Sequence, residues 1–544
     1  MAFLRAAHPW DGYDQKLYES VLDYRECEKQ LKLLSNSTAV LPFIDATAKL
    51  PSGILSLNVN DYGDYYQCLQ IDNQVEDMHL EGKYCFIVVP FSQNISVPGW
   101  MSMGGKMSKF TFSAVGRSLS ESATASTDEF LKSYLAPRNV QKFTSNATIS
   151  RAALRLGVCI PKVCNIDQVN DFITPPIPIP KVEYLSGPCR LPGDKMYTIA
   201  DYVTFGIFGT ILLLTILSTC YDLFQVFIRR KSKAPNRLFT MMSIYTNTKR
   251  LLKFLPPKYS MDCVDGIRAI SMIWVMCGHA YVFELLSPAH NLLDMIEWTT
   301  HLTSTWINTA PMVVDTFFML TGLFCVYTLP NRITAKRFLK SIHIFYLYRY
   351  FRTLPVLVVA ILIQASIIHW IADGPDWDRI SYAVVCCRNR WWATVLHVQN
   401  IIEPTAVCVF QSWYLTVDTQ LYFLSPFIIV FLLMSKAIAW FVLGVSFVIS
   451  IVTLAYYVYY YKYPSVLNGL WYSQQFFEYY VNFYANTATR ASPFIVGLMV
   501  GYILWLNREK GLFLSKVCIT LQQRAARETL MGECPSMPGC GRLS

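Results

Sequence analysis

DCVDGIRAISMIWVMCGH, residues 262–279, is the stretch on which the fold of this chain depends. It is apolar enough for a membrane helix, yet it carries Asp265, Arg268 and His279. Arg268 and His279 are eleven residues apart, so on a helix they share one face and lie roughly 16 Å apart along the axis. If Arg268 lies at the membrane surface, His279 lies near the middle of the bilayer, where an ionisable side chain indicates a function. The alternative is a histidine whose bond to a neighbouring helix only supports packing.

The composition of the chain fits a membrane protein. Of its 544 residues, 53% are hydrophobic and 15% are charged, well below the ~25% charged residues of an average soluble domain. The net charge is +10, but nine Lys or Arg residues and no acid fall within 229–260, directly after an apolar run. This pattern marks a cytosolic loop beside the bilayer and favours anionic lipid headgroups over nucleic acid as its partner.

The first 195 residues have the features of a domain outside the cytosol. Their sequons lie at Asn36, Asn94 and Asn146, which predicts a glycoprotein. Helical spacing at 11–35 and 125–142, with one short strand at 84–90, predicts a small and mostly helical domain. Because the start has no apolar signal sequence, we expect residues that precede it. An even set of cysteines predicts disulfides, with pairings left open; these are Cys27, Cys68, Cys85, Cys159, Cys164 and Cys189.

Seven apolar spans follow, and together they predict a mainly α, multi-pass helical membrane bundle. They cover about 197–228, 264–286, 312–329, 354–371, 412–434, 437–460 and 491–506. The loop at 373–411 falls outside, where Cys408 pairs with Cys386 or Cys387 unless the thiols stay free. The predicted parts are an extracellular or lumenal, disulfide-stapled domain at 1–195, a first transmembrane helix at 197–228, a basic cytosolic loop at 229–260, a six-span membrane domain at 261–507 and an irregular cytosolic tail at 508–544.

Polar residues interrupt the later spans. Asp315 lies near the outer end of the third span, and the small Gly322 deeper in it favours close helix packing. Arg349 and Arg352, three apart at the cytosolic start of the fourth span, are either topology markers or a pair that grips phosphate. The fifth span carries a polar stripe that lines a cavity or joins helices; its members are Tyr414, Asp418, Tyr422 and Ser425. No CxxC or HxxxH motif supports a metal site.

At these residues the chain resembles the membrane-bound acyltransferase 3 family. Four motifs occur in the family's order, namely DGIRAI at 265–270 with His279, DTFFMLTG at 315–322, RYFR at 349–352 and WYLTVDTQ at 413–420. Asp418 stands at the first acid of the last motif, and Thr419 replaces the second acid. Two further regions are similar to the animal branch of nose-resistant-to-fluoxetine-like proteins. They are the cysteine-rich front, with GVCIP at 157–161 and Cys164, and the stretch 484–501.

The resemblance implies an enzyme, an acyltransferase that transfers groups other than aminoacyl groups. It would move an acyl group from cytosolic acyl-CoA to a hydroxyl-bearing or lipid acceptor at or across the bilayer. Arg268, Arg349 and Arg352 would hold the CoA phosphates, and His279 would act as general base or acyl relay. Asp418 or Asp315 would orient the imidazole.

Two other functions remain open, a carrier or receptor for a lipid or small apolar molecule, and an inactive truncated isoform. The expected location is the plasma membrane or the endoplasmic reticulum. Because family members continue with further spans, we expect an open-sided bundle around His279 and no regular packing of the tail from residue 522.

Overall fold

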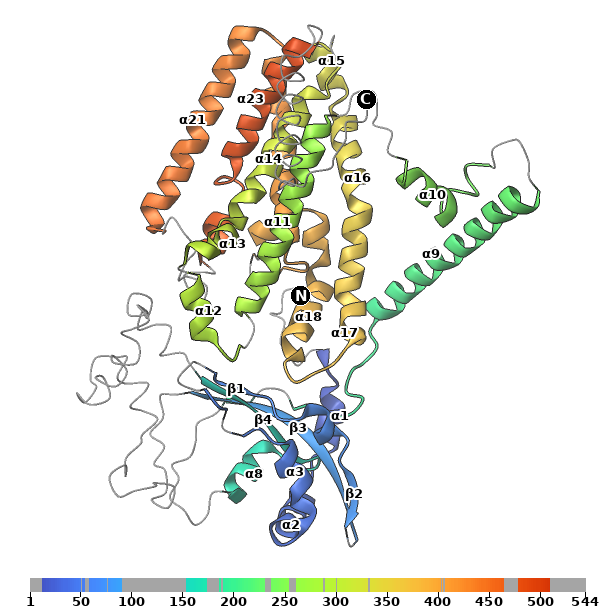
Figure 1. The fold of residues 1–544 in the computed structure, drawn as a ribbon, viewed down its shortest axis with the longest axis vertical. Coiled ribbons are helices and arrows are strands. Elements are labelled where there is room, and N and C mark those ends of the chain that lie inside the picture. The colour runs from blue at the N-terminus through green and yellow to red at the C-terminus, as the bar shows by residue number, and fades with distance from the viewer. Residues whose placement is uncertain are drawn as a thin grey trace, which may run out of the picture.

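A bundle of long helices stands on a smaller mixed domain in the computed structural model of this chain (Figure 1). We call the smaller part the front domain. The bundle has a near end, which faces the front domain, and a far end. The structure describes residues 12–49, 51–53, 58–75, 77–90, 153–173, 185–186, 189–229, 236–253, 261–286, 289–299, 301–330, 333–402, 404, 407–463 and 478–508.

A β-sheet forms the centre of the front domain. Its long antiparallel pair places Cys85 opposite Val158, and the strand order is β1-β4-β3-β2, with β5 also paired to β3. The predicted strand at 84–90 is the second part of β3. The bounds are β1 Asn60–Asp61, β2 Asp72–Val75, β3 Met78–Pro90, β4 Ala153–Pro161 and β5 Leu185–Ser186.

Short helices cover this sheet. The helix expected at 11–35 is divided into α1 and α2, because the Asp23 carboxylate accepts from the backbone N–H groups of Arg25 and Glu26 and starts a new helix. The helix expected at 125–142 lies outside the described residues. The domain has helices within 11–35 as expected, and a larger sheet than the sequence indicated. The helices are α1 Gln15–Ser20, α2 Tyr24–Asn36, η3 Thr38–Val40, α3 Leu41–Ala46, α4 Tyr65–Leu69 and α8 Ile166–Ile173.

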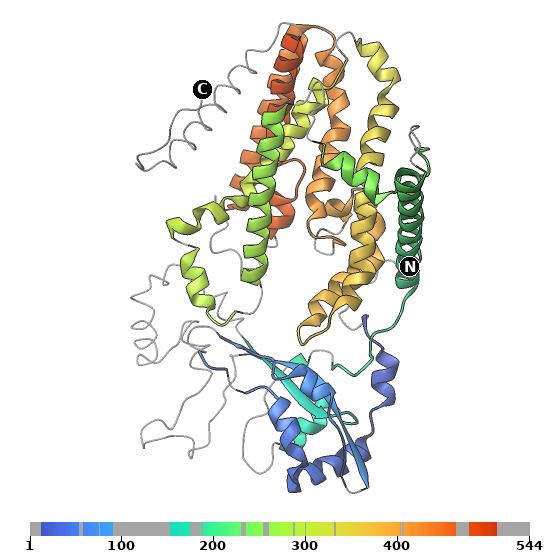
Figure 2. The ribbon, with the colours of Figure 1, turned by 45° about the vertical axis from the view of Figure 1, so that its right-hand side comes forward.

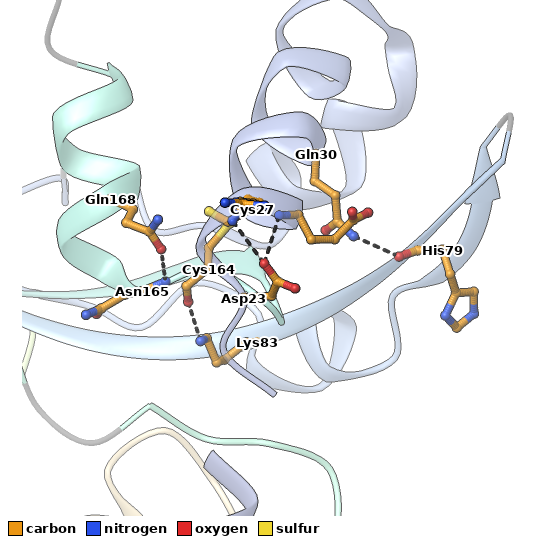
Figure 3. The surroundings of a disulfide bond; sticks show 10 residues. Asp23, Cys27, Gln30, His79, Lys83, Cys164, Asn165 and Gln168 are labelled. Carbon is orange, nitrogen blue, oxygen red and sulfur yellow. Dashed lines mark hydrogen bonds between the residues drawn. A yellow bond between two sulfur atoms is a disulfide. The ribbon is translucent and has the colours of Figure 1, made fainter. Parts of the chain in front are cut away.

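Three disulfides hold the helices and strands of the front domain together, so all six front cysteines are oxidised as predicted. The pairs are Cys27–Cys164, Cys68–Cys159 and Cys85–Cys189. Figure 3 shows the first of them, which ties α2 to the residues that follow β4. Each pair joins segments at least 91 residues apart in the chain, and therefore restricts the unfolded chain strongly.

Six helices are long and apolar enough to cross a membrane within the described residues. They are Ile199–Ile228, Cys263–Glu284, Leu302–Tyr327, Ile342–Ile371, Ser412–Leu432 and Lys436–Tyr461, and a shorter apolar helix covers Ala491–Asn507. All seven predicted spans are therefore helical, and the multi-pass fold class is confirmed.

The helices of the bundle have these bounds: α9 Ile199–Leu223 with a π turn Phe224–Ile228, α10 Ile244–Leu251, α11 Asp262–Leu286, α12 Leu292–Trp298, η9 Leu302–Ser304, α13 Thr305–Asn308, α14 Ala310–Tyr327, α15 Ala335–Lys340, α16 Ile342–Leu362 with a π turn Ile363–Ile367, α17 Ile368–Ile371, α18 Trp377–Val395, α19 Gln399–Ile402, α20 Ser412–Leu432, α21 Lys436–Tyr461, a π turn Tyr480–Tyr484 and α23 Ala491–Asn507.

α14 and α23 pack at very short range at the centre of the bundle. A Cβ on Gly322 would collide with the carbonyl oxygen of Phe494, and one on Gly497 would collide with that of Met319. Glycines let two backbones approach closely, which is the main source of helix association in lipid. The packing role predicted for Gly322 is confirmed.

The fourth span begins earlier than predicted, so Arg349 and Arg352 do not lie at its start. α16 begins at Ile342 and is continuous through both arginines. The sequence favoured a later start because a membrane helix rarely contains two arginines. The helix continues here because Arg349 finds an acidic partner on a neighbouring helix, Asp418.

The segment 373–411 is not simply an outer loop, because α18 runs back into the bundle along α16 (Figure 1). The Arg388 Nε donates to the Ala365 carbonyl at 2.8 Å, and the Tyr350 hydroxyl donates to the Val395 carbonyl at 3.3 Å. The sequence did not predict that α18 packs inside the bundle, because α18 is polar and polar helices are rare at membrane depth. The predicted disulfide is confirmed and joins Cys387 to Cys408.

The first span, α9, lies at the edge of the bundle and contacts it near its own N-terminal end (Figures 1 and 2). There the fully buried Asp201 accepts from the Ser366 hydroxyl at 2.7 Å and from Arg388 at 3.1 Å. This anchor has no local sequence signature, because its partners are more than 160 residues away in the chain.

Asp201→Ala should destabilise the protein by about 3–5 kcal/mol, since it leaves the Arg388 guanidinium without its buried partner. Thermal unfolding of the full chain in detergent measures this. Thr210→Val is the matched control on the same helix, because the exposed Thr210 hydroxyl bonds only to the Gly206 carbonyl. Equal melting temperatures for Asp201→Ala and the control would contradict the anchor.

Lys83 on β3 gives the front domain a pH dependence. Its side chain is fully buried, it donates to the Cys164 carbonyl (Figure 3), and burial lowers its pKa to about 7. Between pH 7 and about 10 the unfolded state binds the extra proton, so stability rises by about 1.4 kcal/mol per pH unit. Below pH 7 both states are protonated and this contribution is constant.

Lys83→Met should remove this rise of stability with pH. Hydrogen–deuterium exchange of β3 amides in the full chain measures the stability, compared between variant and wild type at each pH. The difference in protection should change between pH 7 and 9 and be constant below pH 7. A difference that is independent of pH would show that Lys83 remains charged in the folded domain.

Candidate functional site

The imidazole of His279 is half-buried on α11, with one nitrogen fixed by its own helix. Its Nδ1 lies 2.9 Å from the Val275 carbonyl oxygen. Because a carbonyl only accepts, Nδ1 carries the hydrogen, and Nε2 of the neutral ring presents a lone pair. The structure thus supplies a basic nitrogen within the bundle.

His279 lines a largely apolar cavity, here called the His279 cavity. It encloses about 760 Å³ of non-atom space, part of it open to the surroundings. α11, α14, α20 and the turn at 479–484 form its walls, and its aromatic lining residues include Phe410, Trp413, Tyr480 and Tyr484. The Trp413 and Tyr484 rings are 4.6 Å apart. Such a cavity excludes water and binds an apolar group with few polar contacts.

Arg349 and Asp418 form a buried ion pair between α16 and α20. The Asp418 side chain is 1% exposed and that of Arg349 is 23% exposed. Thr321 of α14 and Tyr414 lie close to the carboxylate. Three motifs that are far apart in the sequence therefore meet at one point. The Asp418 Oδ1 and Arg349 Nε atoms have no hydrogen-bond partner among the described residues.

The other two predicted donor-binding arginines face outward. Arg268 has a 44% exposed side chain, lies 3.5 Å from Asp265, and has its guanidinium 4.7 Å from the Phe324 ring centre. Arg352 is also exposed. Arg268 lies near the start of α11 and Arg352 in the middle of α16. The prediction of three surface arginines is thus wrong for Arg349, whose charge is already paired.

Asp315 is also paired with an arginine. Arg490, just before α23, approaches its two carboxylate oxygens at 3.0 and 3.3 Å. Among the described contacts, neither Asp315 nor Asp418 bonds His279. The prediction that one of them orients the imidazole is not met, because the Val275 carbonyl takes that place.

His397, in the turn between α18 and α19, is a buried titratable group that the sequence did not single out. It is 3% exposed and has a positive φ of 55°. Burial, and then the charge of Arg349, lowers its pKa to about 4, so it is neutral at physiological pH. Its backbone carbonyl accepts from Gln420 at 2.8 Å, which ties the turn to the fifth-span motif. The positive φ is the one feature that distinguishes His397, and a backbone angle cannot be read from a sequence.

The part of the chain that the structure describes contains no group of three His, Cys, Asp or Glu side chains arranged to hold a metal ion.

Both parts of the chain match known protein families. Residues 26–173 match the N-terminal domain of nose resistant-to-fluoxetine proteins, and residues 261–521 match an acyltransferase domain family. Nose resistant to fluoxetine protein 6 of Caenorhabditis elegans is 24% identical over 518 residues, which cover 86% of this chain and 59% of the relative. Regulator of hypoxia-inducible factor 1 of the same organism is 23% identical over 302 residues, 50% of this chain and 56% of the relative.

The chain thus spans less than two thirds of the length of these relatives. No solved structure matches it. The two matched domains occur in the order of the front domain and the bundle described above. The chain thus joins a domain similar to the N-terminal domain of nose resistant-to-fluoxetine proteins to a domain that matches the acyltransferase domain family.

Proposed function

We propose that this protein is a membrane O-acyltransferase whose general base is Nε2 of His279. The observation that carries the proposal is the hydrogen bond from Nδ1 to the Val275 carbonyl, which leaves Nε2 as the nitrogen available for proton transfer beside an apolar cavity. A neutral imidazole matches the requirement for a base near neutral pH. The acyltransferase domain supports the same class of reaction.

The proposed donor is acyl-CoA on the cytosolic side. Nε2 takes the proton of an acceptor hydroxyl while that oxygen attacks the thioester carbonyl carbon. The carbon–sulfur bond then breaks, and the CoA thiolate receives the proton from the imidazolium. The products are an ester and free CoA, and the histidine returns to its neutral form. A relay through acyl-histidine would need the same lone pair.

Arg268 and Arg352 are the groups proposed to hold the phosphates of the donor. Both guanidinium groups are exposed, and arginine binds phosphate through two parallel N–H bonds. Arg349 is assigned another role, since its charge is committed to Asp418. It is a positioning residue that fixes α16 against α20 below the donor site.

The orientation in the membrane is part of the proposal. The disulfides fit an oxidising compartment, so the front domain is extracellular or lumenal and the far end of the bundle is cytosolic. Asn36 is exposed at the end of α2, which supports glycosylation there. The membrane is the plasma membrane or the endoplasmic reticulum.

A carrier of a lipid or small apolar molecule is the second candidate. The observation in its favour is the largely aromatic and aliphatic lining of the His279 cavity. A carrier needs that lining but not the basic nitrogen, so chemistry at His279 separates the two functions.

His279→Gln should lower the acyl-transfer rate by about 10²–10⁴-fold, because an amide has no usable basicity. Radiolabelled acyl-CoA and the full chain in proteoliposomes provide the measurement. The matched control is His343→Gln, since His343 is exposed on α16 and away from the cavity. Equal product from both variants would remove His279 from the chemistry, and ligand movement without acylated product would favour the carrier.

The two arginines of α16 should respond differently to substitution. Arg349→Ala should cost about 3–5 kcal/mol of stability, since it leaves the Asp418 carboxylate buried and unpaired. Arg352→Lys should leave stability unchanged and raise KM for acyl-CoA about 3–30-fold, because a point charge replaces a bidentate group.

Thermal unfolding and initial rates separate these effects. A normal melting temperature for Arg349→Ala would contradict the buried pair. An unchanged KM for Arg352→Lys would remove Arg352 from the donor site.

A further inference from the structure

A second cavity lies beside the His279 cavity and is here called the Asp315 cavity. It encloses about 1360 Å³ of non-atom space, including open space at its mouth. Both cavities share the wall residues Asn308, Pro311, Tyr479 and Tyr484. A molecule held in the second cavity is therefore adjacent to the one that His279 lines.

Among the described residues that line it, the polar part of the Asp315 cavity is neutral overall. The Asp315 carboxylate is 36% exposed and is balanced by the Arg490 guanidinium, which is 11% exposed. Hydroxyl-bearing residues, Thr309 and Ser492, lie in the same wall. A charged head placed here would meet no unpaired opposite charge, and burying it would be costly. An uncharged head with a hydroxyl can donate to the exposed carboxylate.

One side of the cavity is apolar. Met312 comes from α14, Leu454 from α21, Phe483 from the π turn Tyr480–Tyr484 and Pro493 from the first turn of α23. Met312 is 61% exposed, so this wall reaches the outer surface of the bundle. Around a membrane-spanning helix that surface borders acyl chains. A ligand with an apolar chain fits this side of the cavity.

Tyr484 lines both cavities and is held by Arg490 of the ion pair. The Arg490 guanidinium lies 4.4 Å from the Tyr484 ring centre, and its Nε donates to the Tyr484 carbonyl at 3.0 Å. The Tyr484 ring also lies 4.6 Å from the ring of Trp413, which lines the His279 cavity. Asp315 thus acts on the wall through Arg490, as a positioning residue.

We propose that the Asp315 cavity binds the acyl acceptor, and that this acceptor is an uncharged amphiphile with a free hydroxyl. Before reaction its head lies at the Asp315–Arg490 pair and its chain lies along Met312 and Leu454. The hydroxyl then reaches Nε2 of His279 by moving past the wall that the two cavities share. Calling this ligand the acyl acceptor rests on the proposed function. The binding site itself is independent of the chemistry at His279.

Photo-cross-linking of the full chain in nanodiscs with a diazirine-bearing hexadecanol tests the site. Label should map to peptides that contain Leu454 or Phe483. Unlabelled hexadecanol should compete at a concentration about tenfold lower than hexadecanoate or hexadecyltrimethylammonium, because either charge would be uncompensated. Equal competition by all three compounds would overturn the assignment of an uncharged head.

A pair of variants tests the location. Leu454→Trp fills the cavity and should lower labelling at least about fivefold. Val452→Trp is the matched control, since Val452 is 61% exposed on α21 and does not line the cavity. Labelling that is unaffected by Leu454→Trp would overturn the site, and so would an equal loss in both variants.

The chemistry is followed separately with His279→Gln. This variant should keep wild-type labelling and lose ester formation. If wild type is labelled but forms no ester, the binding site stands and the acyltransferase function fails. If wild type forms ester while hexadecanol is not cross-linked in the Asp315 cavity, the function stands and the site is wrong.

Discussion

The constraint on which this structure depends is that a charge inside a bilayer has no water to bind and must find its partner within the protein. Three arginine–aspartate pairs between segments far apart in the chain satisfy it among the described residues of the bundle. Arg388 with Asp201 ties the first span to α18, Arg349 with Asp418 ties α16 to α20, and Arg490 with Asp315 ties the start of α23 to α14. Each pair joins segments far apart in the chain, so together they fix the arrangement of helices that surrounds the two cavities.

Unlike the members of these pairs, His279 does not bond a charged side chain among the described residues. Its ring bonds the backbone of its own helix, which leaves Nε2 with its lone pair. An imidazole with one nitrogen fixed in this way is suited to proton transfer through the other. The pairs therefore serve structure and positioning, and the proposed function assigns the proton transfer to the histidine.

Local patterns in the sequence predicted what is local in the structure. Apolar runs predicted the seven apolar helices of the bundle, and the even number of front cysteines predicted that they are oxidised. Spacing also placed Arg268 and His279 on one helix. Partners distant in the chain could not be predicted this way, because helix periodicity shows which face is polar but not which helix lies opposite. Asp315 and Asp418 were accordingly expected to serve the imidazole, whereas each binds an arginine.

The same limit explains two other differences. β4 pairs with β3 across more than sixty residues, so only the apolar strand at 84–90 was visible. α18 is too polar to read as a helix at membrane depth, yet Ala365 and Tyr350 of the fourth span bond it. The front domain joins the bundle through another pair without a local signature, since Arg190 is 2% exposed and bonds Asp373 at 3.0 Å.

The central claim is that His279 is neutral, with its hydrogen on Nδ1 and a lone pair on Nε2. Nitrogen-15 NMR of the full chain with labelled histidine, in nanodiscs at pH 7, measures this directly. The chain has eight histidines, and the signals lost in His279→Gln assign the one of interest. The account predicts one protonated nitrogen, Nδ1, and one unprotonated nitrogen, Nε2. A doubly protonated ring, or a hydrogen on Nε2, would contradict it.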